Sequence, residues 1–392
     1  MGFLPKGVIG IVSWLKVRVN IIGSNNMSML NTSQSKVFNT KSRAQIKIWV
    51  LASLCMGLLG CGSMPVESRL TEREINKTLV TQFMESRLAL SSAEIQDQFY
   101  SPNYLEVRSE FENLSYNIQG SMLAQQAQPI DQAITNRDDS LELVMGEGSI
   151  VAIRYRIAGT HSGNLYGIPA TGKDFEIYAV AIFELENGKI DEAWFMADEV
   201  DLLMQLGIAM PAREDGQYNI PPTGGEHAIS SDDILSFMLA NPADSKEYRN
   251  KLKIAARKAN NPPPGIIDEE DGRRPYDNFL RPGFKWVVEM GTNFGNPDFG
   301  FGGAYPDRID KMDYFLIDGD TIMIRFRLTG TNTLSMFGLP PTNEPVDAWE
   351  VAFMTFVDEH WRDAWWIGDD QSMLMQLGGA QDFWFPEVSS AN

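Results

Sequence analysis

The sequence has few residues of the types that bind metals, form disulfides or attack substrates. Its 392 residues include three histidines and two cysteines. His161, His227 and His360 are not at metal-ligand spacing from one another, so we expect no metal site. The sequence also lacks a glycine-rich phosphate loop, a nucleophile elbow and a cysteine nucleophile. We therefore expect a protein that works without a metal or a cofactor.

Basic residues are scarce as well. Seven of the 33 basic residues and none of the 52 acidic residues lie in the first 60 positions, so the remainder holds twice as many acidic as basic side chains. Such an acidic surface repels phosphate backbones, and we expect no nucleic-acid partner. The hydrophobic content of 43% is typical of globular proteins, and the chain is long enough for two or three domains.

The two cysteines, Cys55 and Cys61, mark one apolar run. Residues 48–60, IWVLASLCMGLLG, carry no charge and follow a basic flank at 41–47. This is the pattern of a signal peptide, because the run is too short to span a bilayer comfortably. The run ends in LLGC, which resembles the lipobox of bacterial lipoproteins. That resemblance implies removal of Cys55 with the signal and lipidation of Cys61; an ordinary signal peptide or a single anchor helix is the alternative.

On the lipoprotein interpretation, residues 1–60 are an N-terminal extension and signal. Acyl chains on Cys61 would hold a soluble body on a membrane of the bacterial cell envelope. Because a signal normally begins near its first methionine, we expect translation to start at Met27 or Met29, with Met1 as the alternative.

An internal repeat organises the rest of the chain. At a constant shift of 171 residues, 154–207 aligns without a gap with 325–378, and 17 of the 54 aligned pairs are identical. The run LMQLG closes both segments. We therefore predict two domains of one fold. Their bounds are 66–212 and 240–386, and the Pro- and Gly-rich residues 213–239 form the linker between them.

Each predicted domain begins with helices and ends in strands. Thr71 and Glu74 have capping-box spacing at the start of an apolar helical pattern. Farther along, Ile153, Tyr155 and Ile157 alternate with charged residues, as in a strand. Helices followed by antiparallel hairpins predict an α+β fold, in which a curled sheet is covered by helices on one side.

The same alternation, extended to the strand ends, suggests a site. His161 has the parity of Tyr155, while Glu192, Trp194 and Asp198 share a parity on a later strand. If both sets face inward, an imidazole, an indole and two carboxylates meet at the mouth of one apolar cavity. Partial desolvation raises the pKa of a carboxylate in such a place and suits it to proton transfer near neutral pH.

Structural roles are open for the same residues. Asp198 can cap the helix that begins at Glu199, and His161 can hydrogen-bond its own loop. Trp194 is as well suited to a core as to a pocket wall. LMQLG can be an apolar stripe that docks on the sheet.

A family resemblance adds to these patterns. The segment from Gly159 to Gly207 is similar to the C-terminal half of SnoaL-like polyketide cyclases, also called SnoaL-like ester cyclases. The matching motifs are Gly159-Thr160-His161, Gly163, Gly167-Ile168-Pro169, Thr171-Gly172-Lys173, Gly188-Lys189-Ile190, Glu192, Trp194, Asp198 and Gln205-Leu206-Gly207. The second repeat departs from the pattern, with Asn332 in place of His161 and with Asn343 and Glu344 in place of Gly172 and Lys173.

The resemblance implies two tandem NTF2-like cones, each a strongly curved antiparallel sheet around a pocket. It also implies that a pocket aspartate is the acid/base of an intramolecular aldol ring closure without metal or cofactor. By position that residue is Asp198, with His161 as the pocket histidine. The residues expected to contact substrate are Trp194, Tyr155, Tyr178, Glu192, Asp369, Trp365 and Asn332.

We therefore expect a protein that binds a small hydrophobic, carbonyl-containing molecule, with Asp198 and His161 as the catalytic pair of a cyclase or isomerase. The second repeat, which has Asn332, is expected to be a degenerate partner that packs against the first as an internal pseudo-dimer. The alternative is a non-catalytic, ligand-binding or interaction lipoprotein with the same fold.

Overall fold

The computed structural model describes residues 71–210, 215–267 and 278–378. The predicted signal and the lipidation site at Cys61 lie outside the described residues. Residues 67–392 form one compact unit. Among the helices that the structure describes, none is both long and apolar enough to cross a membrane.

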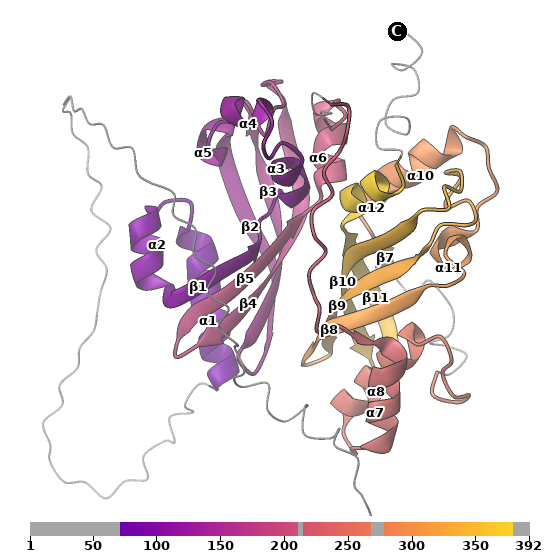
Figure 1. Ribbon diagram of the computed structural model, residues 1–392. Coiled ribbons are helices and arrows are strands. Elements are labelled where there is room, and N and C mark those ends of the chain that lie inside the picture. The colour runs from indigo at the N-terminus through magenta and orange to yellow at the C-terminus, as the bar shows by residue number, and fades with distance from the viewer. Residues whose placement is uncertain (1–70, 211–214, 268–277, 379–392) are drawn as a thin grey trace, which may run out of the picture. The chain divides into compact units, whose positions relative to one another are not determined.

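The first half, residues 71–210, begins with helices and ends in a sheet (Figure 1). Its elements are α1 Glu72–Ser86, α2 Ser92–Gln98, β1 Tyr100–Arg108, α3 Glu112–Asn117, α4 Leu123–Gln126, α5 Ile130–Ala133, β2 Ile134–Glu147, β3 Ile150–His161, β4 Asp174–Glu186, β5 Lys189–Ala197 and α6 Glu199–Leu206.

The second half, residues 229–378, repeats this plan. Its elements are β6 Ile229–Ser230, α7 Ser231–Ala240, α8 Lys246–Lys258, β7 Asn278–Leu280, α10 Phe284–Thr292, α11 Gly300–Ala304, β8 Ile309–Asp318, β9 Thr321–Thr331, β10 Pro345–Val357, β11 His360–Gly368 and α12 Asp370–Gln376. Strand β6 pairs with β8, so part of the predicted linker 213–239 belongs to the second sheet.

The two sheets have corresponding strand orders. The first runs β1-β5-β4-β3-β2, and the second runs β6-β8-β9-β10-β11-β7. In both, the long hairpin strands are antiparallel, and a strand from the helical region adds in parallel to the last of them: β1 to β5, and β7 to β11. The mixed α+β class predicted from the sequence is confirmed.

Short-range signals set the element ends. The Thr71 side chain accepts a hydrogen bond from the Glu74 amide and so caps α1. Gln205 of the LMQLG run accepts from the Glu176 amide at 3.1 Å and donates to the Glu176 carbonyl at 2.7 Å. Gln376 makes the same two bonds to Asp347. The repeated glutamine therefore fixes the last helix of each half to the start of an inner strand, β4 or β10.

Each sheet is buried on both faces. On one face of the first sheet, Ile153 and Tyr155 pack into the main core with Phe83 of α1. On the opposite face, Trp194 lies in a separate apolar layer that also holds Trp349 of the second sheet. Amphipathic alternation is therefore absent from the middle of β4 and β10, which is buried on both faces. Strand β3 keeps it, because Arg154 and Arg156 are only half-buried between buried apolar neighbours.

The aromatic contacts between the halves occur in matched pairs. Trp194 packs edge to face on Trp349 with ring centroids 6.2 Å apart, and Tyr178 packs on Trp365 at 5.5 Å. At the shift of 171 residues, Trp194 corresponds to Trp365 and Tyr178 to Trp349. The same contact is thus made twice with the partners exchanged, which is the pattern of an isologous interface.

Candidate functional site

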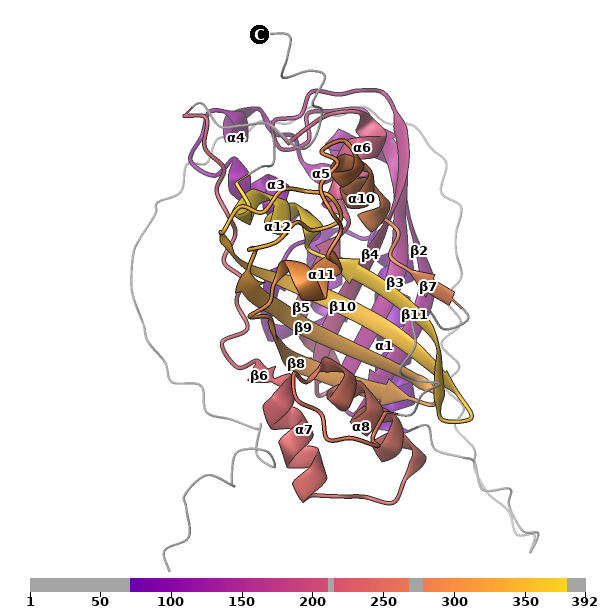
Figure 2. The same ribbon diagram turned by 90° about the vertical axis from the view of Figure 1, so that its right-hand side faces the viewer.

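A cavity of about 710 Å³ lies in the second half and is lined by residues of both its helices and its sheet. Its walls come from α8, α10, α11 and strands β10 and β11, which can be followed in Figure 2. The aromatic part of the lining consists of Phe284, Phe301, Phe337, Trp361 and Trp366. Volume and lining are those of a small-molecule site.

Charged groups form one wall of this cavity. Lys258, at the end of α8, donates to Asp310 at 2.9 Å, and Arg308 donates to the other oxygen of the same carboxylate at 2.8 Å. The Lys258 ammonium also lies over the rings of Phe326 and Trp366, at 3.4 and 4.6 Å from their centroids. Two cations therefore share a single carboxylate beside an aromatic surface.

Burial shifts the protonation of this set. Burial lowers the pKa of Lys258 to about 8, although the Asp310 carboxylate opposes the change. Burial alone would raise the pKa of Asp310, but Lys258 and Arg308 outweigh it and hold that pKa below its usual value. At pH 7 the set is ionised, and Lys258 titrates within reach of neutral pH.

A second charged group lies next to the first. Arg281 donates to Glu350 at 2.6 Å and to Asp370 at 2.5 Å. Glu350 is 4% exposed and comes from the middle of β10, where its neighbours are apolar. Its Oε1 takes the bond from Arg281, while Oε2 has Arg308 only at 3.9 Å. The Oε2 atom of Glu350 is thus only weakly paired with a cation.

The first half contains a closely related set of charges. Arg87 and Arg137 both bond to Asp139, and both also bond to Glu110 at 2.6 Å. Tyr155 adds a third bond to Glu110, also at 2.6 Å. Burial alone would raise the pKa of Glu110, but the two guanidinium groups hold it below its usual value.

The two sets occupy equivalent positions in the chain. Arg87, Arg137, Asp139 and Tyr155 correspond at the shift of 171 residues to Lys258, Arg308, Asp310 and Phe326. The fifth member has no such counterpart, since Glu110 corresponds to Arg281. In the first half, the Glu110 carboxylate and the Tyr155 hydroxyl complete the hydrogen bonding of the cluster. In the second half the equivalent cations line the cavity.

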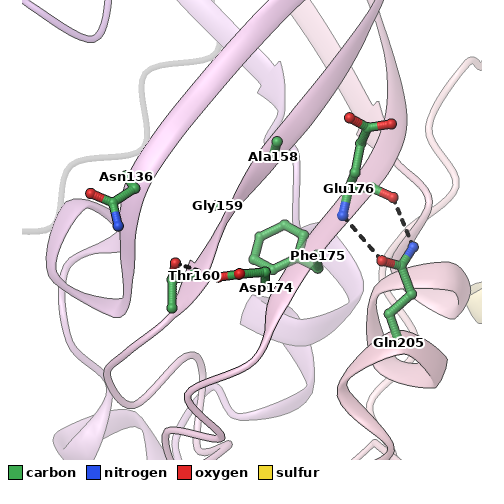
Figure 3. A pocket seen from close by; sticks show the side chains of 8 residues that line it. All are labelled: Asn136, Ala158, Gly159, Thr160, Asp174, Phe175, Glu176 and Gln205. Atoms are coloured by element: carbon green, nitrogen blue, oxygen red, sulfur yellow. Dashed lines mark hydrogen bonds between the residues drawn. The ribbon is translucent and has the colours of Figure 1, made fainter.

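The first half has a hollow of a different kind. It measures about 540 Å³ and lies at the ends of β2, β3 and β4, beside Gln205 of α6 (Figure 3). Two pairs of its lining residues are hydrogen-bonded to each other: Thr160 donates to Asp174 at 2.6 Å, and the Gln205 side chain donates to the Glu176 carbonyl at 2.7 Å. Phe175 is the one aromatic residue in its lining, whereas five aromatic residues line the second-half cavity.

A family model, the SnoaL-like polyketide cyclase, matches residues 79–206 and 301–377, which together make up just over half of the chain. The chain belongs to the SnoaL-like polyketide cyclase family. The match covers parts of both halves, including most of the helices and strands that build the charged sets.

Individual relatives are more distant. The aklanonic acid methyl ester cyclase DauD of Streptomyces sp. (strain C5) is 32% identical over 85 residues, or 22% of this chain. The chain spans about half (53%) of the length of that curated relative. A solved SnoaL-like polyketide cyclase from Agrobacterium tumefaciens is 16% identical, with 34% of this chain and 98% of that chain covered, at a TM-score of 0.27. TsrD of Streptomyces laurentii is 22% identical, with 33% and 96% covered, at 0.27.

The histidine of the SnoaL-like motif is fully buried in its own loop. His161 Nδ1 lies 3.1 Å from the Thr171 hydroxyl and accepts from the Thr171 amide at 3.3 Å. In the second half, Asn332 Oδ1 accepts from the Thr342 amide at 2.9 Å. Burial lowers the pKa of His161. Both residues therefore hold the same loop closed, and neither lines the two cavities described above.

The two family aspartates lie at the junction between the halves. Asp198 caps α6 by accepting from the Asp201 amide at 2.9 Å, and its carboxylate abuts Gly283 of the second half. Burial first, then Asp370 and Asp201, raises the pKa of Asp198 to about 8. Asp369 instead accepts from Arg108 of the first half at 2.7 Å.

The expected meeting of two strand faces does not occur. Tyr155 packs in the main core of the first half, whereas Trp194 packs in the layer between the sheets. Tyr178 and Trp365 contact each other in that same layer. Glu192 of β5 lies opposite Glu184 of β4 in the register of the two strands. The reason is that the second half covers the outer face of the first sheet. Residues that alternate along a strand therefore face either the core of the first half or the interface with the second half, not core and water.

The sequence patterns did not identify the residues that line the second-half cavity as residues of a site. Glu350 was detectable as the one acidic residue in the apolar run from Ala348 to Met354. The Arg-x-Asp pairs at 137–139 and 308–310 recur at the repeat shift, but they lie upstream of the segment that aligns clearly.

Proposed function

We propose that this SnoaL-like protein binds a small apolar molecule with carbonyl groups in the cavity of its second half. The observation that carries the proposal is the cavity of about 710 Å³, which combines aromatic walls with a few converging charged groups. The sequence-based expectation placed the ligand in the first half. The second half is favoured because the equivalent cations of the first half bond to Glu110, which also accepts a hydrogen bond from Tyr155.

We further propose that Glu350 is the base of a cofactor-free, cyclase-type reaction. It would remove a proton from a carbon next to a carbonyl, and the enolate carbon would then attack a second carbonyl of the same molecule. One C–C bond forms and the proton ends on the new alkoxide oxygen, so substrate and product are isomers. Asp310 is less suited to this role, because Lys258 and Arg308 occupy its oxygens.

The binding step can be tested with 2-acetylnaphthalene, a neutral aromatic ketone, by calorimetry on the full chain. Gly302 lines the cavity and has open space where a Cβ would lie. We expect Gly302→Trp to abolish binding and the matched control Gly302→Ala to retain it. Equal binding by both variants would place the ligand elsewhere.

The proton-transfer step can be tested with the same ketone. We expect the protein to accelerate deuterium exchange of the acetyl protons in D₂O, followed by NMR. Glu350→Gln should bind the ketone without exchange.

The alternative proposal keeps the sequence-based pair, Asp198 and His161, as the catalytic groups; it is supported by the raised pKa of Asp198, about 8. Loss of exchange in Asp198→Asn, with retention in Glu350→Gln, would favour that alternative.

Two proposals concern the whole chain. The first is that the halves are a tandem duplication of one NTF2-like cone that packs as an internal pseudo-dimer, supported by the exchanged Trp194–Trp349 and Tyr178–Trp365 contacts. The second is that a lipid on Cys61 anchors the protein in a bacterial envelope. Cys61→Ser should then move the protein from the membrane fraction to the soluble fraction; an unchanged distribution would contradict the anchor.

A further inference from the structure

Lys258 is a nucleophilic side chain that the proposed reaction leaves unused. It lines the cavity of the second half, although its side chain is only 9% exposed. Its ammonium lies over the rings of Phe326 and Trp366. A buried, largely apolar environment is one of the means by which proteins make a lysine amine nucleophilic toward carbonyl compounds near neutral pH.

The ion pairs around Lys258 allow it to lose a proton. Arg308 donates to both oxygens of Asp310, at 2.8 and 3.1 Å, so this buried carboxylate stays paired when Lys258 is neutral. Burial and, to a smaller extent, the charge of Arg308 lower the pKa of Lys258 to about 8. The carboxylates of Asp310 and Glu350 oppose the change. At pH 7 about a tenth of Lys258 is then the free amine.

The first half has an arginine at the equivalent position. Arg87 donates to Asp139 at 3.0 Å and lies over the ring of Tyr155, as Lys258 does with Asp310 and Phe326. The ion pair and the aromatic contact therefore do not require a lysine. A guanidinium stays charged at any physiological pH and is a poor nucleophile, whereas an amine can react. The lysine stands in the half whose cavity it lines, and Arg87 does not line the first-half hollow.

We propose that Lys258 forms an imine with a carbonyl carbon of the ligand in this cavity, and that Asp310 is the counterion of the protonated imine. This inference rests on the proposed function, which places a carbonyl compound there. The C=O bond breaks and a C=N bond forms. Of the three hydrogens on the ammonium, two leave with the carbonyl oxygen as water and one stays on the iminium nitrogen. The charge at Lys258 is unchanged, so its match with Asp310 is kept.

The imine deepens the proposed reaction. An iminium group draws electrons from the neighbouring carbon more strongly than a neutral carbonyl does. When Glu350 removes the proton, the C–H electron pair forms a C=C bond and the C=N pair returns to nitrogen. The product is a neutral enamine, so no buried enolate anion is created. The enamine carbon attacks the second carbonyl, whose oxygen takes the proton from Glu350, and water then releases the product from Lys258.

The test treats the full chain at pH 7 with 2-naphthaldehyde and sodium cyanoborohydride, which reduces an iminium to a stable secondary amine. Peptide mass spectrometry then locates the adduct. We expect Lys258 to be modified at least about tenfold faster than Lys251 of the same helix. Lys251 pairs with Glu147 at 2.9 Å and does not line the cavity. Its side chain is 20% exposed, so accessibility alone predicts the opposite order. Excess 2-acetylnaphthalene should slow modification of Lys258 only.

Lys258→Arg copies the residue of the first half and keeps a cation beside Asp310. It should lose the adduct and still bind 2-acetylnaphthalene in calorimetry, which also reports that the variant folds. Gly302→Trp should lose the adduct as well, whereas the matched control Lys251→Arg should leave modification of Lys258 unchanged. Modification of Lys258 that is no faster than that of Lys251, or that persists in Gly302→Trp, would overturn the imine. If 2-acetylnaphthalene still binds, the proposed function stands. Absence of both the adduct and ketone binding would overturn both proposals.

Discussion

The two family aspartates should respond in opposite directions to the same substitution. Asp198 has a pKa raised to about 8, because it is buried near Asp370 and Asp201. A folded pKa above the unfolded one means that the folded chain binds the extra proton. The free energy of unfolding therefore falls as pH rises from about 4 to about 8 and is level above that range.

Asp198→Asn removes this penalty. Asparagine caps helices as well as aspartate does, so the cap on α6 is kept. A pKa that moves from 3.8 to about 8 corresponds to at most about 6 kcal/mol, and relaxation around a buried charge reduces this, so we expect a gain of about 2–4 kcal/mol at pH 8.5. At pH 4.5 the gain should be small, because the carboxyl is then protonated in the folded chain.

Asp369→Asn is the matched control at the equivalent position. Asp369 accepts from Arg108 at 2.7 Å, with both side chains at most 7% exposed. Removing one partner of a buried ion pair typically costs about 3–5 kcal/mol, and we expect a loss of that order at pH 8.5. Urea unfolding of both variants at pH 4.5, 6.5 and 8.5 gives the comparison. If Asp198→Asn lowers stability at pH 8.5 as Asp369→Asn does, the Asp198 carboxylate is ionised and favourably paired, and the reasoning fails.

Two further outcomes are expected. His161→Asn should change the free energy of unfolding little, because Asn332 makes the equivalent loop bond, whereas His161→Ala should lower it by about 1–2 kcal/mol in urea titrations. Tyr155→Phe should lower it by about 1–3 kcal/mol, because Glu110 loses a buried hydrogen bond; an unchanged stability would contradict that role.

Local sequence signals predict local structure well in this chain. The Thr71 cap starts α1, the repeat shift predicts matching hairpins in both sheets, and the capping alternative for Asp198 is what the helix start of α6 shows. These features depend on a few neighbouring residues, whose backbone bonds are short-range.

The placement of side chains at the site could not be predicted in the same way. Alternation in β3 and β5 separates two faces, but the assignment of each face depends on what packs against it. Trp194 and Tyr155 have equally buried, apolar surroundings in different layers, since the second half replaces water on the outer face. Partners such as Arg87 and Asp139, 52 residues apart, are visible only once the chain is folded.

The comparison of the two charged sets has a thermodynamic consequence. In the first half, Glu110 balances Arg87 and Arg137, which favours folding of that half without any ligand. In the second half, three basic side chains (Lys258, Arg281 and Arg308) meet three carboxylates (Asp310, Glu350 and Asp370), and all of these residues except Asp370 line the cavity. A ligand that binds only the folded state adds RT ln(1 + [L]/Kd) to its stability, which is about 2.7 kcal/mol at a hundredfold excess over Kd. Saturating 2-acetylnaphthalene should therefore raise Tm in the unmodified protein and not in Gly302→Trp, because the stabilisation depends on occupancy of the cavity in the second half.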